Sequence, residues 1–479
     1  MVETMKLIPP RFIPPLDEGF RPAALANRAF RKDVEEAGGG EPLILALERN
    51  DGGVDRLETH IFSARHPRAA ENLFYVERLL KFMLWQYGGW KVYIAGSQAV
   101  ADQLQKIYSP QGERAFDYHF LGNEVYHQPF TVVACQSSEA PPQRDTSSPI
   151  GRHLDGCRIG FDLGASDLKV SAVVDGEAVF SQEIVWQPRL QADPGYHYDQ
   201  VMAALRMAAA EMPRVDAIGG SSAGIYIDNQ VMIASLFRGV PQERYHEVRT
   251  LFLRIRDQLG VPLEITNDGD VAALAGSMSL EDTSVLGVAL GSSEAGGYVN
   301  REGKITGWLN ELAFAPIDYQ PGAPQDEWSQ DRGVGAMYFS QQCVFRLAPK
   351  AGIQIPAEWV DADKLKYVQQ MLESGHIGAQ QIWESIGIYL GYGVAHYADF
   401  YDLKHVLILG RVTTGRGGDI ILERAQQVLL SEFPELAERI QIQLPDEKSR
   451  RVGQAIAAAS LPIIVAGAPV DSGGLLQPS

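Results

Sequence analysis

The segment from residue 162 to residue 169 carries the residue types that bind a phosphorylated ligand and its metal ion. An apolar run leads into Asp162-Leu163-Gly164-Ala165-Ser166-Asp167-Leu168-Lys169. Glycine at such a turn lets backbone N–H groups approach an anionic oxygen, Ser166 adds a hydroxyl donor, and Asp162 is suited to hold Mg²⁺ through water. A tight turn without any ligand uses the same residue types, so this segment alone leaves both interpretations open.

The elements that must position this turn follow from periodicity. Alternating apolar residues predict strands on both sides of it, and Asp175-Gly176 predicts the next hairpin. Further strands are expected at 217–221, 263–265, 285–290 and 406–409, with helices at 198–212, 244–259, 363–374, 379–401 and 450–468. Strands that alternate with helices in this way predict an α/β fold with two lobes.

A polar, proline-bearing segment at 136–153 reads as a linker, which sets off a small α/β unit before it. The predicted organisation is a small N-terminal domain at 1–140, a smaller lobe at 155–265 with 450–470, and a larger lobe at 266–449. The N-terminal domain shows no catalytic pattern, so a structural or dimerisation role is the simplest interpretation.

Composition excludes several classes of protein. The chain is 45% hydrophobic and 21% charged, and its formal net charge of −18 argues against binding to nucleic acid or to anionic membranes. No apolar run has the length of a membrane span, so a cytoplasmic protein is expected. The three cysteines are scattered, which suggests neither a disulfide framework nor a zinc site.

The order of several segments resembles the ROK family of sugar kinases, within the superfamily of actin, hexokinase and the heat-shock chaperone ATPases. The resemblance covers about residues 157–470. It rests on the turn at 162–169, Ser221 to Asp228, Thr266 to Leu274, Leu290 to Gly297, Asn310 to Phe314, Leu407 to Val412, and Gly453 to Ala459. It implies a two-lobed actin-like ATPase (ribonuclease H-like) fold, with the small α/β N-terminal domain as an addition.

The resemblance also implies ATP- and Mg²⁺-dependent phosphorylation of a sugar or sugar-like hydroxyl. Such a transfer needs a carboxylate that accepts the proton of the attacking hydroxyl, and Asp268 is the candidate base. Asn267 beside it is suited to bind neighbouring hydroxyls. In isolation, Asn267-Asp268-Gly269 is equally typical of a turn that caps a helix.

Other roles follow from the same resemblance. Asp162 would organise Mg²⁺, and phosphates would contact Gly164, Ser166, Lys169, Gly291 and Ser292, while Gly410 would allow close approach of adenosine. Glu311 and Glu327 are the candidate acids for the sugar, although Glu327 is as easily a solvated loop residue. Related kinases are often dimers, so a homodimer is expected.

The chain departs from the family pattern at three positions; the first puts glucose itself in doubt as the acceptor, and the other two favour an alternative function. Phe314 stands where the family has a sugar-binding histidine, Glu294 stands in the second phosphate loop, and Arg411 follows Gly410 in place of glycine. A sugar-binding sensor or regulatory protein that has lost nucleotide binding is therefore the alternative to the kinase. A DNA-binding repressor is disfavoured because residues 1–140 lack a basic recognition helix.

Overall fold

A computed structural model describes residues 5–146, 150–445, 447–464 and 470–471. The contacts divide the chain into two compact units. Unit 1 contains Met1–Thr146, Val288–Gly296 and Trp308–Leu444; unit 2 contains Ser147–Gly287, Gly297–Gly307 and Pro445–Ser479. Each unit is thus built from segments that are far apart in the sequence.

Unit 2 is organised around a five-stranded sheet of order β12-β9-β5-β6-β7. Its strands are β5 (Cys157–Leu163), β6 (Asp167–Val174), β7 (Glu177–Val185), β9 (Ala217–Ser222) and β12 (Leu263–Asn267). Strands β5, β9 and β12 run parallel, whereas β5, β6 and β7 form antiparallel hairpins. Asp175 and Gly176 both have positive φ, as the predicted tight hairpin turn between β6 and β7 requires.

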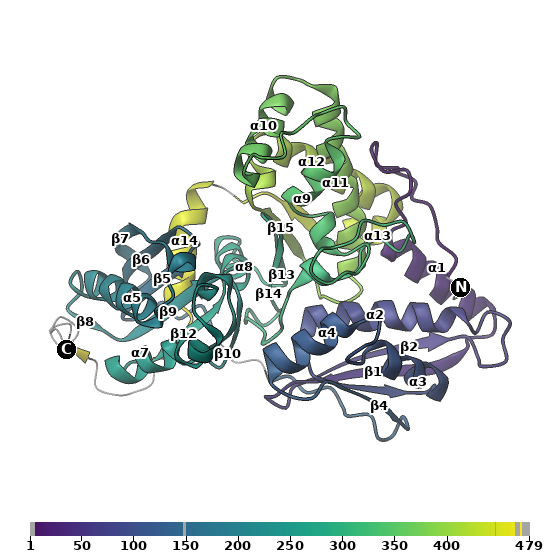
Figure 1. Ribbon diagram of the computed structural model, residues 1–479, viewed down its shortest axis with the longest axis horizontal. Coiled ribbons are helices and arrows are strands. Elements are labelled where there is room, and N and C mark those ends of the chain that lie inside the picture. The colour runs from purple at the N-terminus through teal and green to yellow at the C-terminus, as the bar shows by residue number, and fades with distance from the viewer. Residues whose placement is uncertain (1–4, 147–149, 446, 465–469, 472–479) are drawn as a thin grey trace. The chain divides into compact units, whose positions relative to one another are not determined.

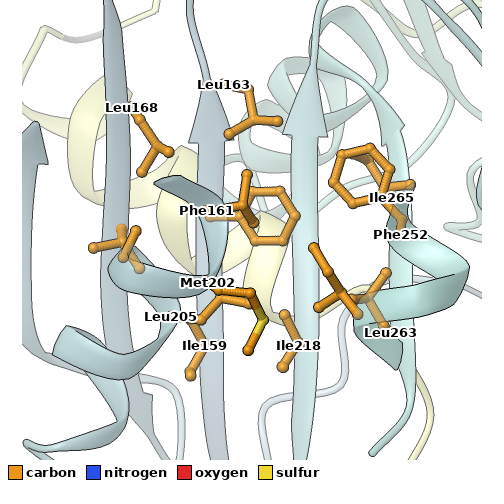
Figure 2. Packing of buried hydrophobic residues seen from close by; sticks show 14 of the residues in the cluster. Ile159, Phe161, Leu163, Leu168, Met202, Leu205, Ile218, Phe252, Leu263 and Ile265 are labelled. Carbon is orange, nitrogen blue, oxygen red and sulfur yellow. The ribbon is translucent and has the colours of Figure 1, made fainter. Parts of the chain in front are cut away.

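One face of this sheet carries the main core of unit 2. Side chains of alternate strand residues, such as Ile159 and Phe161, pack against Met202 and Leu205 of α5 and Phe252 of α7 (Figure 2). The helices of this unit are α5 (Pro194–Ala209), α6 (Tyr245–Arg249), α7 (Leu251–Leu259), α8 (Asp268–Ser279) and α14 (Glu447–Ala459). Its short strands are β8 (Arg214–Val215), β10 (Ile225–Ile227), β11 (Gln230–Ile233) and β17 (Val470–Asp471).

Helix α14 packs against the opposite face of the same sheet. A Cβ on Gly160 would lie 2.2 Å from the carbonyl oxygen of Ala455, and one on Gly219 would lie 1.7 Å from that of Ala458. Gly160 and Gly219 face each other on neighbouring strands. These two glycines therefore let the backbone of the yellow helix α14 rest directly on β5 and β9 (Figure 1).

Unit 1 begins with a four-stranded sheet of order β2-β1-β3-β4. Its strands are β1 (Glu41–Glu48), β2 (Val54–Ile61), β3 (Lys91–Ala95) and β4 (Thr131–Cys135), accompanied by α1 (Ala23–Glu36), α2 (Glu71–Tyr87), α3 (Gln98–Ile107), α4 (Ala115–His119) and a π-helical segment at Phe120–Tyr126. Strand β1 pairs antiparallel with β2 and β3, and β4 joins β3 in parallel.

The remainder of unit 1 surrounds a second sheet of order β14-β13-β15-β16. Its strands are β13 (Val285–Leu290), β14 (Glu294–Val299), β15 (His405–Leu409) and β16 (Gln441–Gln443), of which β13 begins and β14 ends within unit 2. The helices are α9 (Gln341–Leu347), α10 (Asp361–Glu373), α11 (Ile377–Tyr397), α12 (Arg416–Glu432) and α13 (Pro434–Ala437). Gly387 and Gly391 let α11 pack closely on α12.

The structure differs from the sequence-based expectations in several respects. The helix expected at 244–259 is divided into α6 and α7 at Thr250. The last helix ends at Ala459 and the chain is non-helical from there to residue 464, while 465–468 lie outside the described residues. Helices α1 and α12 were not predicted. Residues 1–146 share one compact unit with 308–444, and the separate N-terminal domain at 1–140 stays a prediction from the sequence.

Candidate functional site

The predicted chemistry of unit 2 gathers where three parallel strands end. Asp162 of β5 pairs with Ser221 of β9, and Ser222 pairs with Asn267 of β12. Asp268 follows directly as the first residue of α8. The carboxyl ends of parallel strands are where α/β sheets bind ligands. These five residues form what we term the carboxyl edge of unit 2.

Asp162 lies partly buried at the carboxyl edge. The hydroxyl of Ser221 donates a hydrogen bond to its Oδ1. Burial raises the pKa of Asp162, although the Ser221 hydrogen bond and the charge of Lys169, which faces it across the β5–β6 hairpin, both lower it. Ser221 belongs to the 221–228 segment of the family resemblance, but its contact with Asp162 was not predicted.

Asp268 has the properties of a proton acceptor that works near neutral pH. Burial raises its pKa to about 6, and the negative charge of Asp162 contributes to the increase. The backbone N–H of Gly269 donates to Oδ1 of Asp268 at 3.0 Å. A carboxylate with such a pKa is ionised at pH 7 and yet basic enough to take a proton from a hydroxyl during attack.

Asn267 holds the local backbone in place. Its Oδ1 accepts from the N–H of Gly269 at 2.7 Å, which caps α8, and its Nδ2 donates to the carbonyl of Gly224 at 2.8 Å. The helix-capping interpretation is therefore correct for Asn267. Because the cap begins the helix at Asp268, it also positions the candidate base.

In the predicted phosphate turn, the polar groups at 164–169 bind Asp167 of the same turn. The N–H of Gly164 donates to the carbonyl of Asp167 at 2.8 Å, and the Ser166 hydroxyl donates to Oδ1 of Asp167 at 3.2 Å. Lys169 pairs with Oδ2 of Asp167 at 2.9 Å. The three residues predicted to bind phosphate are thus brought together around Asp167. Asp167 itself was not among the predicted phosphate-binding residues.

In unit 1, the predicted second phosphate loop lies beside the predicted adenosine strand. Gly291 and the exposed Ser292 connect β13 to β14, and Gly410 follows β15. A Cβ on Gly410 would lie 2.4 Å from the carbonyl oxygen of Leu290, and its φ is +94°. Only glycine fits this position without strain. The exposed Arg411 follows, and its carbonyl accepts from Gln369 at 2.9 Å.

Glu294 turns into the interior of unit 1. Its Oε1 accepts a hydrogen bond from the hydroxyl of Tyr397 at 2.8 Å, whereas Oε2 lies against Gly335 and has no hydrogen-bond partner among the described residues. Burial raises the pKa of Glu294 to about 8. The acid is therefore mostly neutral at pH 7, which weakens the electrostatic argument that it repels a triphosphate.

The segment that contains Glu311 is attached to the N-terminal part of unit 1. The N–H groups of Asn310 and Glu311 donate at 2.9 Å to the carbonyls of Gln86 and Trp85, two of the last carbonyls of α2. Such carbonyls have no partner within their own helix. Phe314 packs against Trp85 with ring centroids 4.4 Å apart. Glu311 itself is half-buried.

Glu327 lies on an exposed loop whose ends are held rigidly. Oδ2 of Asp326 accepts the backbone N–H and hydroxyl of Ser329, both at 2.7 Å. Asp331, at the far end, is buried against Arg78 and Arg114. Glu327 and Trp328 are exposed at the tip. A sugar-binding role for Glu327 thus stays a prediction from the sequence.

No group of three or more His, Cys, Asp and Glu residues is placed to hold a metal ion within the described ranges. The donor set around Asp162 fits Mg²⁺ in its usual protein setting, in which one or two carboxylates bind an ion that keeps several waters. The observation that bears on this fit is the pair of carboxylates at one edge of the sheet, Asp162 near the end of β5 and Asp268 at the start of α8. The charge of Asp162 raises the pKa of Asp268, and a nearby cation would oppose this effect.

Comparison with solved structures assigns the fold. The ROK hexokinase from Thermus thermophilus is similar over 63% of this chain and 97% of its own, with a TM-score of 0.50 and 17% sequence identity. This chain has the ROK fold. A ROK family transcriptional regulator, a homolog of the E. coli MLC protein, is similar over 68% of this chain and 80% of its own, with a TM-score of 0.52 and 17% identity.

The ROK fold agrees with the two-lobed α/β architecture predicted from the motif order. The compared proteins leave about a third of this chain uncovered, which is room for an additional domain.

No family model matches the chain, and no curated protein matches it as a relative. Within the described residues, no helix is long and apolar enough to cross a membrane.

Proposed function

We propose that this protein transfers the γ-phosphoryl group of ATP to a hydroxyl of a sugar or sugar-like alcohol. The observation that carries the proposal is the carboxyl edge of unit 2, where Asp162 stands beside an Asp268 whose pKa is about 6. The acceptor oxygen attacks the γ-phosphorus, the bond to the ADP oxygen breaks, and Asp268 takes the hydroxyl proton.

The remaining residues have positioning roles in this proposal. Asp162 holds Mg²⁺, which would neutralise charge on the phosphates. Gly164, Ser166, Gly291 and Ser292 contact phosphates, and Gly410 leaves space for adenosine. Asn267, Glu311 and Glu327 bind the acceptor. Lys169 must exchange Asp167 for a phosphate, because its ammonium group already has that carboxylate as a partner.

The second candidate is a sugar-binding sensor or regulator that does not transfer phosphate. The observation that favours it is the self-contained turn at 164–169, in which Asp167 takes the donors that a nucleotide would need. The solved structure of a ROK transcriptional regulator shows that the fold also serves non-enzymes. In either case we propose a cytoplasmic homodimer that binds neither nucleic acid nor membranes.

Titration calorimetry with Mg²⁺-ATP and Mg²⁺-ADP tests the kinase first, because it does not require the acceptor to be known. The kinase requires binding that is weakened by Asp162→Ala, followed by sugar-dependent release of ADP that is lost in Asp268→Asn. Retention of nucleotide affinity in Asp167→Asn would show that the turn opens for phosphate. If no nucleotide binds, the sensor replaces the kinase.

A further inference from the structure

Two buried hydroxyl groups lie beside the carboxyl edge of unit 2. Ser222 ends β9, pairs in register with Asn267 and is fully buried. Tyr226 lies four residues later in β10, and its hydroxyl oxygen is also buried. Tyr226 follows two residues after Gly224, whose carbonyl accepts a hydrogen bond from Asn267 beside the candidate base, and the charges of Asp268 and Asp162 both act on its hydroxyl.

Neither hydroxyl is satisfied by the protein. Ser222 Oγ and Tyr226 Oη have no hydrogen-bond partner among the described residues. Ser222 is close enough to lower the pKa of Tyr226, but the two oxygens do not reach hydrogen-bond geometry. A buried hydroxyl without a partner destabilises the folded state, so two of them at one site are unexpected in a region that serves stability alone.

The surrounding groups restrict what these hydroxyls do. Burial raises the pKa of Tyr226, with further increases from Tyr245, Asp268 and Asp162, so its hydroxyl keeps its proton and acts as a donor. Asn267 beside Ser222 already uses its amide on Gly269 and Gly224. The hydrogen-bonding capacity that the protein leaves unused here is therefore that of Ser222 and Tyr226.

We propose that Ser222 and Tyr226 are specificity-determining residues, which bind the acceptor hydroxyl that neighbours the one deprotonated by Asp268. This inference rests on the proposed acceptor site. It names the substrate class as a vicinal diol of a sugar or polyol. One hydroxyl of the diol donates to Asp268, and its neighbour accepts from Tyr226 and Ser222.

The diol should be distinguished strongly from its deoxy analogue. A site that is built to hydrogen-bond a substrate hydroxyl rejects an analogue without it, because the buried groups of the site then stay unpaired. Monohydric alcohols, and sugars that lack the one neighbouring hydroxyl, should therefore bind poorly even when the attacked hydroxyl is present.

The test measures sugar binding without nucleotide, by calorimetry on the full-length protein. The probes are D-glucose, D-mannose and N-acetyl-D-mannosamine, followed by the monodeoxy analogues of the sugar that binds best. We expect Tyr226→Phe and Ser222→Ala each to weaken binding by about tenfold or more. The analogue that lacks the sugar hydroxyl bound by Tyr226 should bind wild type and Tyr226→Phe equally, since neither complex can form that hydrogen bond.

Two controls separate specificity from structure. Tyr198→Phe removes a tyrosine hydroxyl that is paired with Gln258 in the same unit and should leave sugar affinity unchanged. Tyr226→Phe should unfold at the same urea concentration as wild type or higher, because it removes an unpaired buried oxygen. Strong destabilisation by Tyr226→Phe would indicate a structural role and overturn the inference.

The remaining outcomes are distinct from those of the kinase test. Equal sugar affinity in Tyr226→Phe and wild type, or no binding of any probe, overturns the inference. Sugar binding that depends on Tyr226 without ADP release leaves the inference standing and rejects the kinase. Phosphoryl transfer at the same rate in Tyr226→Phe, Ser222→Ala and wild type leaves the kinase standing and rejects the inference.

Discussion

Burial, and to a smaller extent the charge of Asp162, raise the pKa of Asp268, and this sets opposite pH dependences for activity and stability. Transfer should increase as pH rises toward about 6, because the base must be deprotonated, and Mg²⁺ bound at Asp162 should move this increase to lower pH. The unfolded chain loses this proton near the ordinary pKa of aspartate, so the free energy of unfolding should fall as pH rises from about 4 to 6.

Asp268→Asn should remove both effects. We expect no measurable transfer at any pH and a flatter dependence of unfolding free energy on pH, with the variant about 1–2 kcal/mol more stable at neutral pH. A pH profile of kcat/KM measures the transfer, and urea unfolding at acid and neutral pH measures the unfolding free energy. The exposed Asp228→Asn is the matched control and should change neither. Transfer that persists in Asp268→Asn contradicts the assignment of the base.

Glu294 predicts a second pH effect, located in unit 1. Burial raises its pKa to about 8, so the folded protein keeps a proton that the unfolded chain releases near pH 4.5. The unfolding free energy should therefore fall between these pH values, and Glu294→Gln should remove that fall. We expect the variant to be about 1–3 kcal/mol more stable than wild type at pH 8. Urea unfolding measures this, with the exposed Glu302→Gln as control.

At the scale of elements, a buried ion cluster joins α2 and the segment around α4 to the loop that carries Glu327. Its cations are Arg78, Lys81 and Arg114, and its anions are Glu77, Asp117 and Asp331. Lys81 contacts Asp117 at 2.6 Å, and Arg114 contacts Asp331 at 2.8 Å. Buried charges persist only when they are paired in this way.

Asp331→Asn should destabilise unit 1 by about 3–5 kcal/mol, because the three buried cations then share only two buried carboxylates, Glu77 and Asp117. Arg78, Lys81 and Arg114 hold the pKa of Asp331 below its usual range, in spite of burial, which raises it. The stabilisation is thus present above the ordinary pKa of aspartate, and the difference from wild type should shrink below about pH 4. Urea unfolding at two pH values measures it.

The cluster supplies its own control. Glu113 pairs with Arg114 at 3.3 Å but is 68% exposed, and such surface pairs contribute little. Glu113→Gln should change the unfolding free energy by less than about 1 kcal/mol. Equal effects of Asp331→Asn and Glu113→Gln would show that the cluster does not hold the loop.

At the scale of the whole molecule, the N-terminal residues are part of the framework of unit 1. Asp17 and Phe20 reach α11, where the Tyr389 hydroxyl donates to Asp17 at 2.7 Å and the Phe20 ring packs on Tyr389. The last carbonyls of α2 accept from the segment at 310–311. Deletion of residues 1–140 would remove these partners and leave the buried side chains of α11 and the backbone N–H groups at 310–311 without them.

We therefore expect the truncated chain to lose cooperative unfolding of unit 1, rather than to behave as a kinase without an accessory domain. Circular dichroism and limited proteolysis measure this, and sedimentation of the full-length protein tests the proposed homodimer. A truncated chain that unfolds as cooperatively as the full chain and keeps its activity would mean that the N-terminal residues are a separable addition.

The sequence by itself determined the order of the motifs and most strands. Strand β13 begins and ends where the pattern predicts, at Val285–Leu290. Alternation and turn residues are local properties, so they can be read without the fold. Local sequence also indicates a helix start at Asn267 and Asp268 and a hairpin turn at Asp162, because their neighbours in the chain are of the residue types that these features require.

Only the tertiary structure decided how these residues are used. Asp331 meets Arg78 across 253 positions of sequence, and Glu294 meets Tyr397 across 103. Such contacts decide that Glu294 is neutral and that the N-terminal residues belong to unit 1. They also leave the Ser222 and Tyr226 hydroxyls unpaired. Protonation, burial and hydrogen-bond satisfaction depend on which side chains from distant parts of the sequence come into contact. The periodicity of the sequence does not predict such contacts.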